Sequence, residues 1–434
     1  MSVPSSSSEP PPKSTPSPRA PYPDFTIEGA RQIYPLCAAI LCERLAAFTL
    51  ISTTAAMLCE RFGFSRPDSL RICGLFSAAC YIGSVPGGHL LDRSASPSRG
   101  FTGSLLLLVL GYVFLATPYR AAAFAGFAVL AIGHAFYKPS TQRVLTTLFP
   151  TKDSRLEGAQ VMLHFAINVG AAAGAFLAGI MVRSAGWSVS YAFSALMVGI
   201  GMALSTAQPS QSVASHVPSK IATPSGSTTQ PLGNLSTILA VLAAMFVLAI
   251  TTAQAEGALL LWSEHNVRRV ILGFELPTAW FVAYAAVMVL ILSPMQLVLL
   301  SKRKRPGTTN RLVAVGLLSA ALCFAILLPT TQNDGSVSIL WPITTYTLFV
   351  LAEMLIAPLG LALLHRNSPQ RLMGLVTGLW YGAGALGYFV GGQIGALWSK
   401  WPTQRVLILL SVLPLLGAAL IWVVQPADIQ ESET

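Results

Sequence analysis

Five charged side chains lie inside long apolar stretches of the sequence, namely Glu43, Arg44, Lys138, Glu256 and Glu353. A charge near the middle of a bilayer costs about 2.5 to 3.5 kcal/mol on insertion scales, so each of them needs a function or a partner. Glu43 and Arg44 are adjacent and therefore project in directions about 100° apart on a helix. We expect these two to have different partners, an arrangement that suits the wall of a cavity.

The charges of these five side chains do not balance. Three carboxylates and two cations leave a net charge of −1 when all are ionised. A carboxylate without a cation in a low-dielectric cavity is pushed toward its protonated form, so it takes up or releases a proton depending on which side the cavity faces. The cations could clamp an anionic group while Glu353 meets an ammonium group, which favours a zwitterion as substrate. The alternative is purely structural, with each charge paired only to lock helices together.

Composition indicates which elements must position these charges. Of the 434 residues, 53% are hydrophobic and 10% are charged, and the mean hydropathy is +0.62. Soluble domains average about 25% charged residues, so a water-soluble globule is excluded. We expect an all-α integral membrane protein with twelve transmembrane helices, in the apolar runs 34–59, 70–91, 101–118, 121–149, 159–184, 187–206, 235–261, 278–301, 312–330, 339–364, 373–398 and 406–424.

Polar segments divide the twelve runs into two groups of six. We expect a disordered tail at 1–30, an N-terminal six-helix bundle at 31–206, a linker at 207–234, a C-terminal six-helix bundle at 235–424 and a tail at 425–434. If the head lies in the cytoplasm, sixteen Lys and Arg residues fall on the cytoplasmic side and nine on the other. That bias predicts a plasma (inner) membrane protein with both termini cytoplasmic.

Other classes of function find no support in the motifs. The net charge of +10 forms no basic patch with interleaved aromatic residues, which argues against nucleic acid as a partner. Gly382, Gly384 and Gly387 form GxGxxG inside an apolar run with no preceding strand, which argues against a nucleotide site. Gly387, Gly391 and Gly395 recur every four residues, and together with Gly170 and Gly174 they predict close helix packing. The sequence also lacks metal-ligand spacings and the HExxH and GxSxG motifs, so we expect no cofactor, no metal and no enzyme.

Several short motifs occur in order along the chain. They are Cys42-Glu43-Arg44; Tyr81, Gly87, Gly88, Asp92 and Arg93; Tyr137-Lys138-Pro139-Ser140; Ile167, Asn168 and Gly170; LLLWSEHNVRR at 259–269 with GFELPTAWF at 273–281; Glu353, Pro358, Gly360 and Leu361; and Gly378, Leu379 and Trp380. With these motifs the sequence resembles the proton-dependent oligopeptide transporter family of the major facilitator superfamily, from about residue 34 to 400. The resemblance implies the major facilitator fold, which alternates access by rocking one bundle against the other.

The resemblance also implies roles for individual residues. Arg44 and Lys138 would grip a peptide carboxylate, and Glu353 would receive the amino terminus. Tyr81 and Asn168 would hydrogen-bond the peptide backbone, and Trp380 would wall a side-chain pocket. Glu43 would belong to the proton relay. From the residues themselves we also expect Glu256 and His164 to take part in proton coupling, and Asp92 and Arg93 to form a cytoplasmic gate. The implied partners are a small peptide or zwitterionic solute, protons and the lipid bilayer, with the chain a monomer.

The chain departs from the family pattern in its functional centre. The first acid of the ExxER signature is Ile40, and the tyrosine pair after it is Ala47 and Phe48. The acid of the seventh run is Ala253, with Glu256 three residues on and roughly on the same face. We therefore keep two alternatives to a symporter of di- or tripeptides: a transporter of another small organic solute or drug-like compound, with altered or no proton coupling, and a non-transporting membrane sensor or scaffold.

Three histidines in the apolar runs need their own interpretation. His164 replaces a tyrosine of the family pattern and would titrate near neutral pH if it lined a cavity, so it could replace a lost relay group. The alternative is a neutral histidine that bonds a neighbouring helix. We expect that structural role for His89 and His134.

Overall fold

The structure is a computed structural model that describes residues 32–92, 96–149, 156–206, 235–301, 308–332, 336–368 and 373–424. The expected tails and linker, 1–30, 207–234 and 425–434, lie outside the described residues. The N-terminal half contains α1 (Tyr34–Glu60), α2 (Arg66–Ile82), α3 (Ser84–Asp92), α4 (Pro97–Ala116), α5 (Arg120–Leu148) and α6 (Leu156–Thr206).

The C-terminal half continues the helical pattern and adds four short strands. Its elements are α7 (Leu235–Ala253), the π-helical turn η2 (Gln254–Ala258), α8 (Leu259–Asn266), β1 (Val267–Arg268), β2 (Val270–Ile271), β3 (Phe274–Glu275), α9 (Ala279–Ser301), α10 (Thr308–Ala325), the 3-10 turn η3 (Leu328–Gln332), β4 (Val337–Ser338), α11 (Leu340–Arg366), α12 (Met373–Leu397) and α13 (Thr403–Val423).

The helices match the length and polarity of a membrane. Ten helices among the described residues are long and apolar enough to cross a bilayer. One of them, α6, has 51 residues and is broken at Gly186, whose φ of 79° is not helical. At 1.5 Å per residue its two parts are each long enough for one crossing. Together with α12, which has 25 residues and is rich in glycine, these helices are consistent with the expected twelve spans, and that count stays a prediction.

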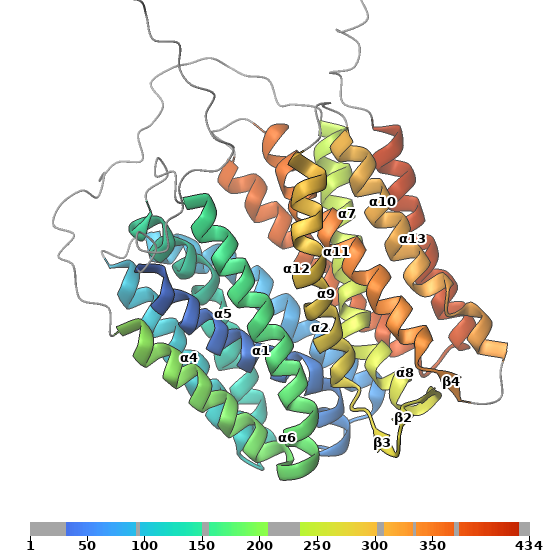
Figure 1. The fold of residues 1–434 in the computed structure, drawn as a ribbon, viewed down its shortest axis with the longest axis horizontal. Coiled ribbons are helices and arrows are strands. Elements are labelled where there is room, and N and C mark those ends of the chain that lie inside the picture. Colours follow the sequence, from blue (N-terminus) through green and yellow to red (C-terminus); the bar gives the residue numbers. More distant parts are fainter. Residues whose placement is uncertain are drawn as a thin grey trace, which may run out of the picture.

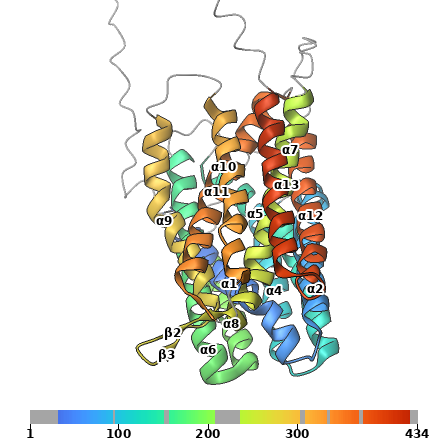
Figure 2. The same ribbon diagram turned by 90° about the vertical axis from the view of Figure 1, so that its right-hand side faces the viewer.

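Two sides of the molecule are used below. Strands β2 and β3 form an antiparallel hairpin between α8 and α9, and we call this end of the molecule the hairpin side. In Figure 1 the hairpin lies at the bottom, while α7 begins and α13 ends at the top, on the opposite side. Figure 2, the view turned by 90°, shows the same hairpin projecting from the lower end of the helices.

Glycines allow helices of the two halves to approach backbone to backbone. A Cβ added to Gly74 of α2 would lie 2.7 Å from the Cα of Gly392 in α12. Within one half, Gly170 and Gly174 of α6 face the backbone of α1, and Gly387 and Gly391 of α12 face α7. The interpretation of the glycine pattern as close helix packing is thus confirmed.

On the hairpin side the two halves are also joined by α6 and α9. The rings of Phe176 and Trp280 stack with centroids 4.7 Å apart, and the indole N–H of Trp280 donates to the Phe176 carbonyl at 3.1 Å. Beyond them Arg183 of α6 pairs with Glu275 of the hairpin at 3.3 Å. Toward the opposite side both helices turn exposed apolar residues outward, including Phe165 and Ile291. The ring stacking, the indole hydrogen bond and the ion pair between these segments therefore all lie on the hairpin side.

Candidate functional site

Glu43 and Arg44 form an ion pair with each other in the N-terminal half. The Arg44 Nε lies 2.5 Å from Glu43 Oε2, and Nη2 lies 2.6 Å from Oε1. The expectation that each faces a different partner is therefore wrong. Their Cα–Cβ bonds do diverge, but both side chains are long enough to fold back, and a fully buried carboxylate favours the nearest cation. The Glu43 side chain is 0% exposed, so this pair neutralises it away from water.

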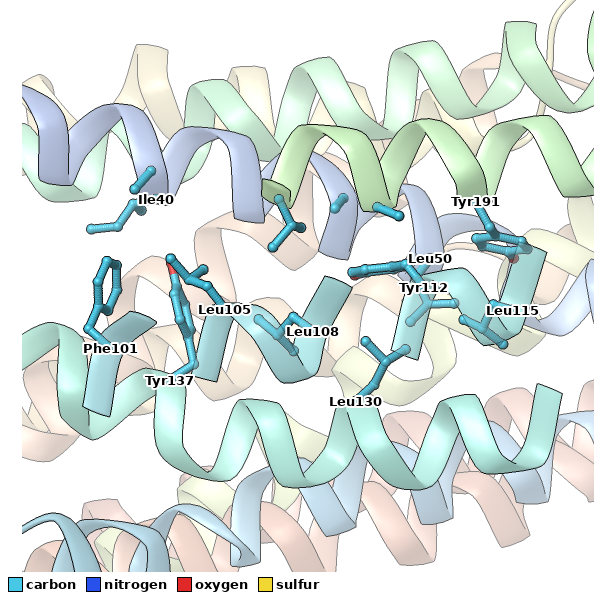
Figure 3. Close-up of a cluster of buried hydrophobic side chains, with 14 of the residues drawn as sticks. Ile40, Leu50, Phe101, Leu105, Leu108, Tyr112, Leu115, Leu130, Tyr137 and Tyr191 are labelled. Carbon is cyan, nitrogen blue, oxygen red and sulfur yellow. The ribbon is translucent and has the colours of Figure 1, made fainter. Parts of the chain in front are cut away.

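Neighbouring helices fix the position of this pair. A Cβ added to Gly170 of α6 would lie 2.8 Å from the Arg44 Cβ, so only glycine leaves room for the arginine there. The guanidinium lies over the ring of Tyr137 at 5.6 Å. One turn before Arg44, Ile40 is 1% exposed and lies near Phe101 and Tyr137 in the apolar core shown in Figure 3. The position of the missing acid is thus filled by a packing residue.

Lys138 lies in α5 directly before Pro139. Its ammonium lies 3.8 Å from the centroid of the Tyr81 ring, a cation–π contact. Within the part of the chain that the structure describes, no carboxylate pairs with Lys138 at ion-pair distance. Pro139 cannot donate to the carbonyl four residues earlier, that of Ala135. Gly87 of α3 packs directly against this carbonyl, where a Cβ would overlap it.

Glu256 lies in the π-helical turn η2, between α7 and α8. Such turns insert one residue into a helix and are frequent at functional sites. Glu256 also lines a pocket between the two halves. The N-terminal half contributes residues of α1 and α2 such as Thr54 and Gly74, and the C-terminal half contributes α12 residues such as Tyr388 and Gly392. Arg66 at the start of α2 contacts His265 at the end of α8, next to the hairpin, so Glu256 and this pocket lie in the part of the interface between the halves that is toward the hairpin side.

Glu353 is carried by α11, five residues before Pro358. Pro358 leaves the Met354 carbonyl without its helical partner. The side-chain amide of Gln296, on α9, donates to this carbonyl at 2.7 Å. A bond from a second helix thus replaces the missing one and fixes the backbone next to Glu353.

Lys138, Glu256 and Glu353 interact electrostatically across the two halves. Glu256 interacts with both Glu353 and Lys138, and Lys138 also interacts with Arg44 and Glu43. Since Glu43 and Arg44 neutralise each other, two carboxylates and one ammonium remain, and Glu256 is the member that interacts with both of the others. The surplus negative charge expected from the sequence therefore belongs to this group of three, which we call the Lys138 triad.

The other expected site residues are distributed unevenly. Tyr81 contacts the rings of Tyr381 and Tyr388, with centroids 6.4 and 5.0 Å away, and it interacts electrostatically with Glu256 and Glu353. Asn168 bonds His164 on its own helix, with its amide nitrogen 3.2 Å from the ring Nε2. His164 is exposed.

Trp380 belongs to an apolar cluster of the C-terminal half. Trp380 is 4% exposed and packs against Gly360 of α11 in the core of the C-terminal half. Asp92 is the last residue of α3, and the structure does not describe its side chain. Arg93 lies outside the described residues. The gate therefore stays a prediction.

His134 contacts a charged group, which the sequence did not predict. Its Nδ1 lies 3.7 Å from Glu43 Oε1, and the residue is 7% exposed. The expected hydrogen bond from His134 to a neighbouring helix is replaced by this contact with a charged group. Helical spacing could have revealed it, because His134 lies four residues before Lys138 and hence on the same face of α5.

Comparisons with known proteins agree with this arrangement. A family model described as Major Facilitator Superfamily matches residues 36–392. The peptide transporter YePEPT of Yersinia enterocolitica is 24% identical, over 83% of this chain and 87% of that protein. Dipeptide and tripeptide permease A of Pectobacterium carotovorum is 26% identical, over 82% of this chain and 80% of that protein.

A solved structure of a POT family transporter in complex with 5-aminolevulinic acid has the same fold, with a TM-score of 0.82. It is 14% identical and is matched over 91% of this chain and 96% of that one. The expected fold class is thereby confirmed, as is the resemblance to the family of peptide transporters.

Proposed function

Because this chain belongs to the Major Facilitator Superfamily, we propose that it is a proton-coupled symporter of di- and tripeptides or similar small zwitterions. It works by alternating access, in which one half rocks against the other. The relatives named as peptide transporters and as dipeptide and tripeptide permeases support this choice of substrate. The chain acts as a monomer in a plasma (inner) membrane, with both termini in the cytoplasm and the hairpin side outside.

The Lys138 triad is the observation that carries the proposal. Two carboxylates and one ammonium in a membrane interior carry a full surplus charge when all are ionised, and binding one proton removes it. Glu256 faces the pocket on the hairpin side and receives the proton from there. Protonation weakens its interaction with Lys138, so the ammonium becomes available for a substrate carboxylate.

The substrate is held at both of its ends. Arg44 and Lys138, from the N-terminal half, bind the carboxylate, and Glu353, from the C-terminal half, binds the amino group. A zwitterion that spans the two halves then draws them together, since it pairs with opposite charges on each. Tyr81 and Asn168 bond the peptide backbone, and Trp380 supports the pocket from within the C-terminal half.

Uptake into proteoliposomes tests this proposal. The protein is reconstituted and given radiolabelled dialanine, with the outside either at the same pH as the lumen or more acidic. We expect dialanine to accumulate in the lumen above its outside concentration only when the outside is more acidic. This accumulation should be lost in Lys138→Ala. Uptake that ignores the pH difference would remove the coupling.

One observation favours a second substrate class, namely small zwitterions other than peptides. Ile40, Ala47 and Ala253 stand where the family pattern has polar groups, and the structure packs Ile40 and Ala47 into the apolar interior. Thermal-shift measurements with a panel of peptides and of non-peptide zwitterions such as amino acids would separate the two substrate classes. A ligand that binds only the folded state raises the melting temperature.

A further inference from the structure

Glu43 has two potential cationic partners in the structure. Arg44 bonds it through two nitrogens, at 2.5 and 2.6 Å. On the other side of the carboxylate, the His134 Nδ1 lies 3.7 Å from Oε1. The imidazole is therefore in contact with Glu43 but is not its main partner while Arg44 remains in place.

The burial of this site makes an unpaired Glu43 costly. Its side chain is 0% exposed and that of His134 is 9% exposed. A buried carboxylate that loses its cation is destabilised by several kcal/mol unless a proton or another cation replaces it. Arg44, by contrast, is 16% exposed, so it is the member of the pair that can turn outward.

We propose that His134 is the reserve partner of Glu43: it binds a proton and pairs with Glu43 when Arg44 turns to the substrate carboxylate. The role of Arg44 in this exchange rests on the proposed function. The pairing of His134 with Glu43 rests on their contact in the structure. The proton comes from solution and is held on the imidazole, whose N–H donates to the carboxylate. When Arg44 returns, the proton leaves and the original pair forms again. Substrate binding is thus coupled to proton uptake within the N-terminal half, about one helical turn away from Lys138 on the same helix.

The helices around His134 determine what else could act on its charge. The titratable and charged groups that face this site are Glu43 and Arg44 of α1, Cys80 of α2, Tyr112 of α4, and Tyr137 and Lys138 of α5. Glu43 is the one carboxylic acid among them, and the two cations Arg44 and Lys138 oppose protonation of the ring. Removal of Arg44 therefore changes the site in two ways that both favour a protonated His134.

Nitrogen NMR of the histidine rings measures this effect directly and needs no substrate. The purified protein is labelled with ¹⁵N in its six histidines, and the signals of His134 are identified by their loss in His134→Asn. We expect the protonated fraction of His134 at mildly acidic pH to rise several-fold in Arg44→Gln. In the double variant Glu43→Gln/Arg44→Gln the rise should largely disappear. His164, which is exposed on α6, provides an internal control because its signals should not change.

Several outcomes separate this inference from the proposed function. A protonated fraction of His134 that is the same in wild type and Arg44→Gln overturns the inference, as does an equal rise in the double variant. If a variant unfolds, Arg44→Lys retains the charge but loses the second bond, and a smaller rise is expected there. If the rise occurs but dialanine is not transported, the inference holds and the proposed function fails.

Discussion

At the scale of single residues, the structure separates the five membrane charges into a neutral pair and a charged triad. Glu43 and Arg44 neutralise each other, so the imbalance lies with Lys138, Glu256 and Glu353. Counting charges in the sequence predicted the imbalance, because the count does not depend on geometry. It could not predict the pairing. Neighbouring residues on a helix point about 100° apart, but the long side chains of Glu43 and Arg44 can bend back toward each other.

The two acids of the triad should differ in what they do. Replacement by glutamine removes the proton site but preserves size and hydrogen bonding. In Glu256→Gln we expect dialanine uptake to become independent of an acidic outside, while exchange of labelled for unlabelled dialanine across the membrane continues. Wild-type uptake should rise as the outside becomes more acidic, because the protonated form of Glu256 starts the cycle.

Glu353→Gln should instead weaken recognition of the substrate. Loss of a buried ion pair with the amino group costs about 3 to 5 kcal/mol, so we expect the KM for dialanine to rise at least about tenfold. Glu60→Gln is the matched control, since Glu60 is exposed at the end of α1. An equal rise of KM in Glu60→Gln would contradict a specific role for Glu353.

At the scale of elements, the site depends on two backbone carbonyls that Pro139 and Pro358 leave without a helical hydrogen-bond donor. Other helices contact both carbonyls. Gly87 packs against the carbonyl that Pro139 cannot bond, and Gln296 donates to the carbonyl that Pro358 cannot bond. The motifs around Gly87 and Pro358 were visible in the sequence, as were the boundaries of most apolar runs. Gln296 was not, because nothing in a single sequence indicates which helix will face a proline of another.

The bond from Gln296 can be tested separately from the charges. In Gln296→Leu the Met354 carbonyl loses its donor, and an unsatisfied buried carbonyl costs about 1 to 3 kcal/mol. We expect a lower melting temperature in detergent and weaker dialanine uptake, because the backbone beside Glu353 is no longer fixed. Gln393→Leu is the control, since Gln393 is exposed on α12. An unchanged melting temperature in Gln296→Leu would show that water or another group bonds the carbonyl.

At the scale of the whole molecule, glycine and aromatic residues join the two halves. The halves meet through glycine backbones at Gly74 and Gly392 and through Phe176 and Trp280, all on the hairpin side. Small residues spaced along the chain predicted close helix packing. Which helices of opposite halves would meet could not be predicted, since every apolar run offers similar faces to several neighbours.

A larger side chain at Gly392 should hold the hairpin side apart. Cys73 lines the pocket between the halves and is a free thiol, so its reaction with a membrane-impermeant maleimide reports on access from that side. With the other five cysteines replaced by serine, we expect Cys73 to react several-fold faster in Gly392→Leu. Gly103→Leu is the control, because a Cβ at Gly103 would meet nothing within 4 Å. Equal rates in all three proteins would mean that the glycine contact does not control closure.

The surplus charge of the Lys138 triad also has an electrical consequence. A cycle that carries one proton with an overall neutral zwitterion moves one elementary charge through the membrane, and 100 mV across the bilayer is then worth about 2.3 kcal/mol per turnover. Because about 1.4 kcal/mol corresponds to a tenfold ratio, a resting potential of that size alone would sustain a gradient of roughly fiftyfold. A single unpaired carboxylate is therefore enough for the membrane potential, and not only the pH difference, to drive accumulation of the substrate.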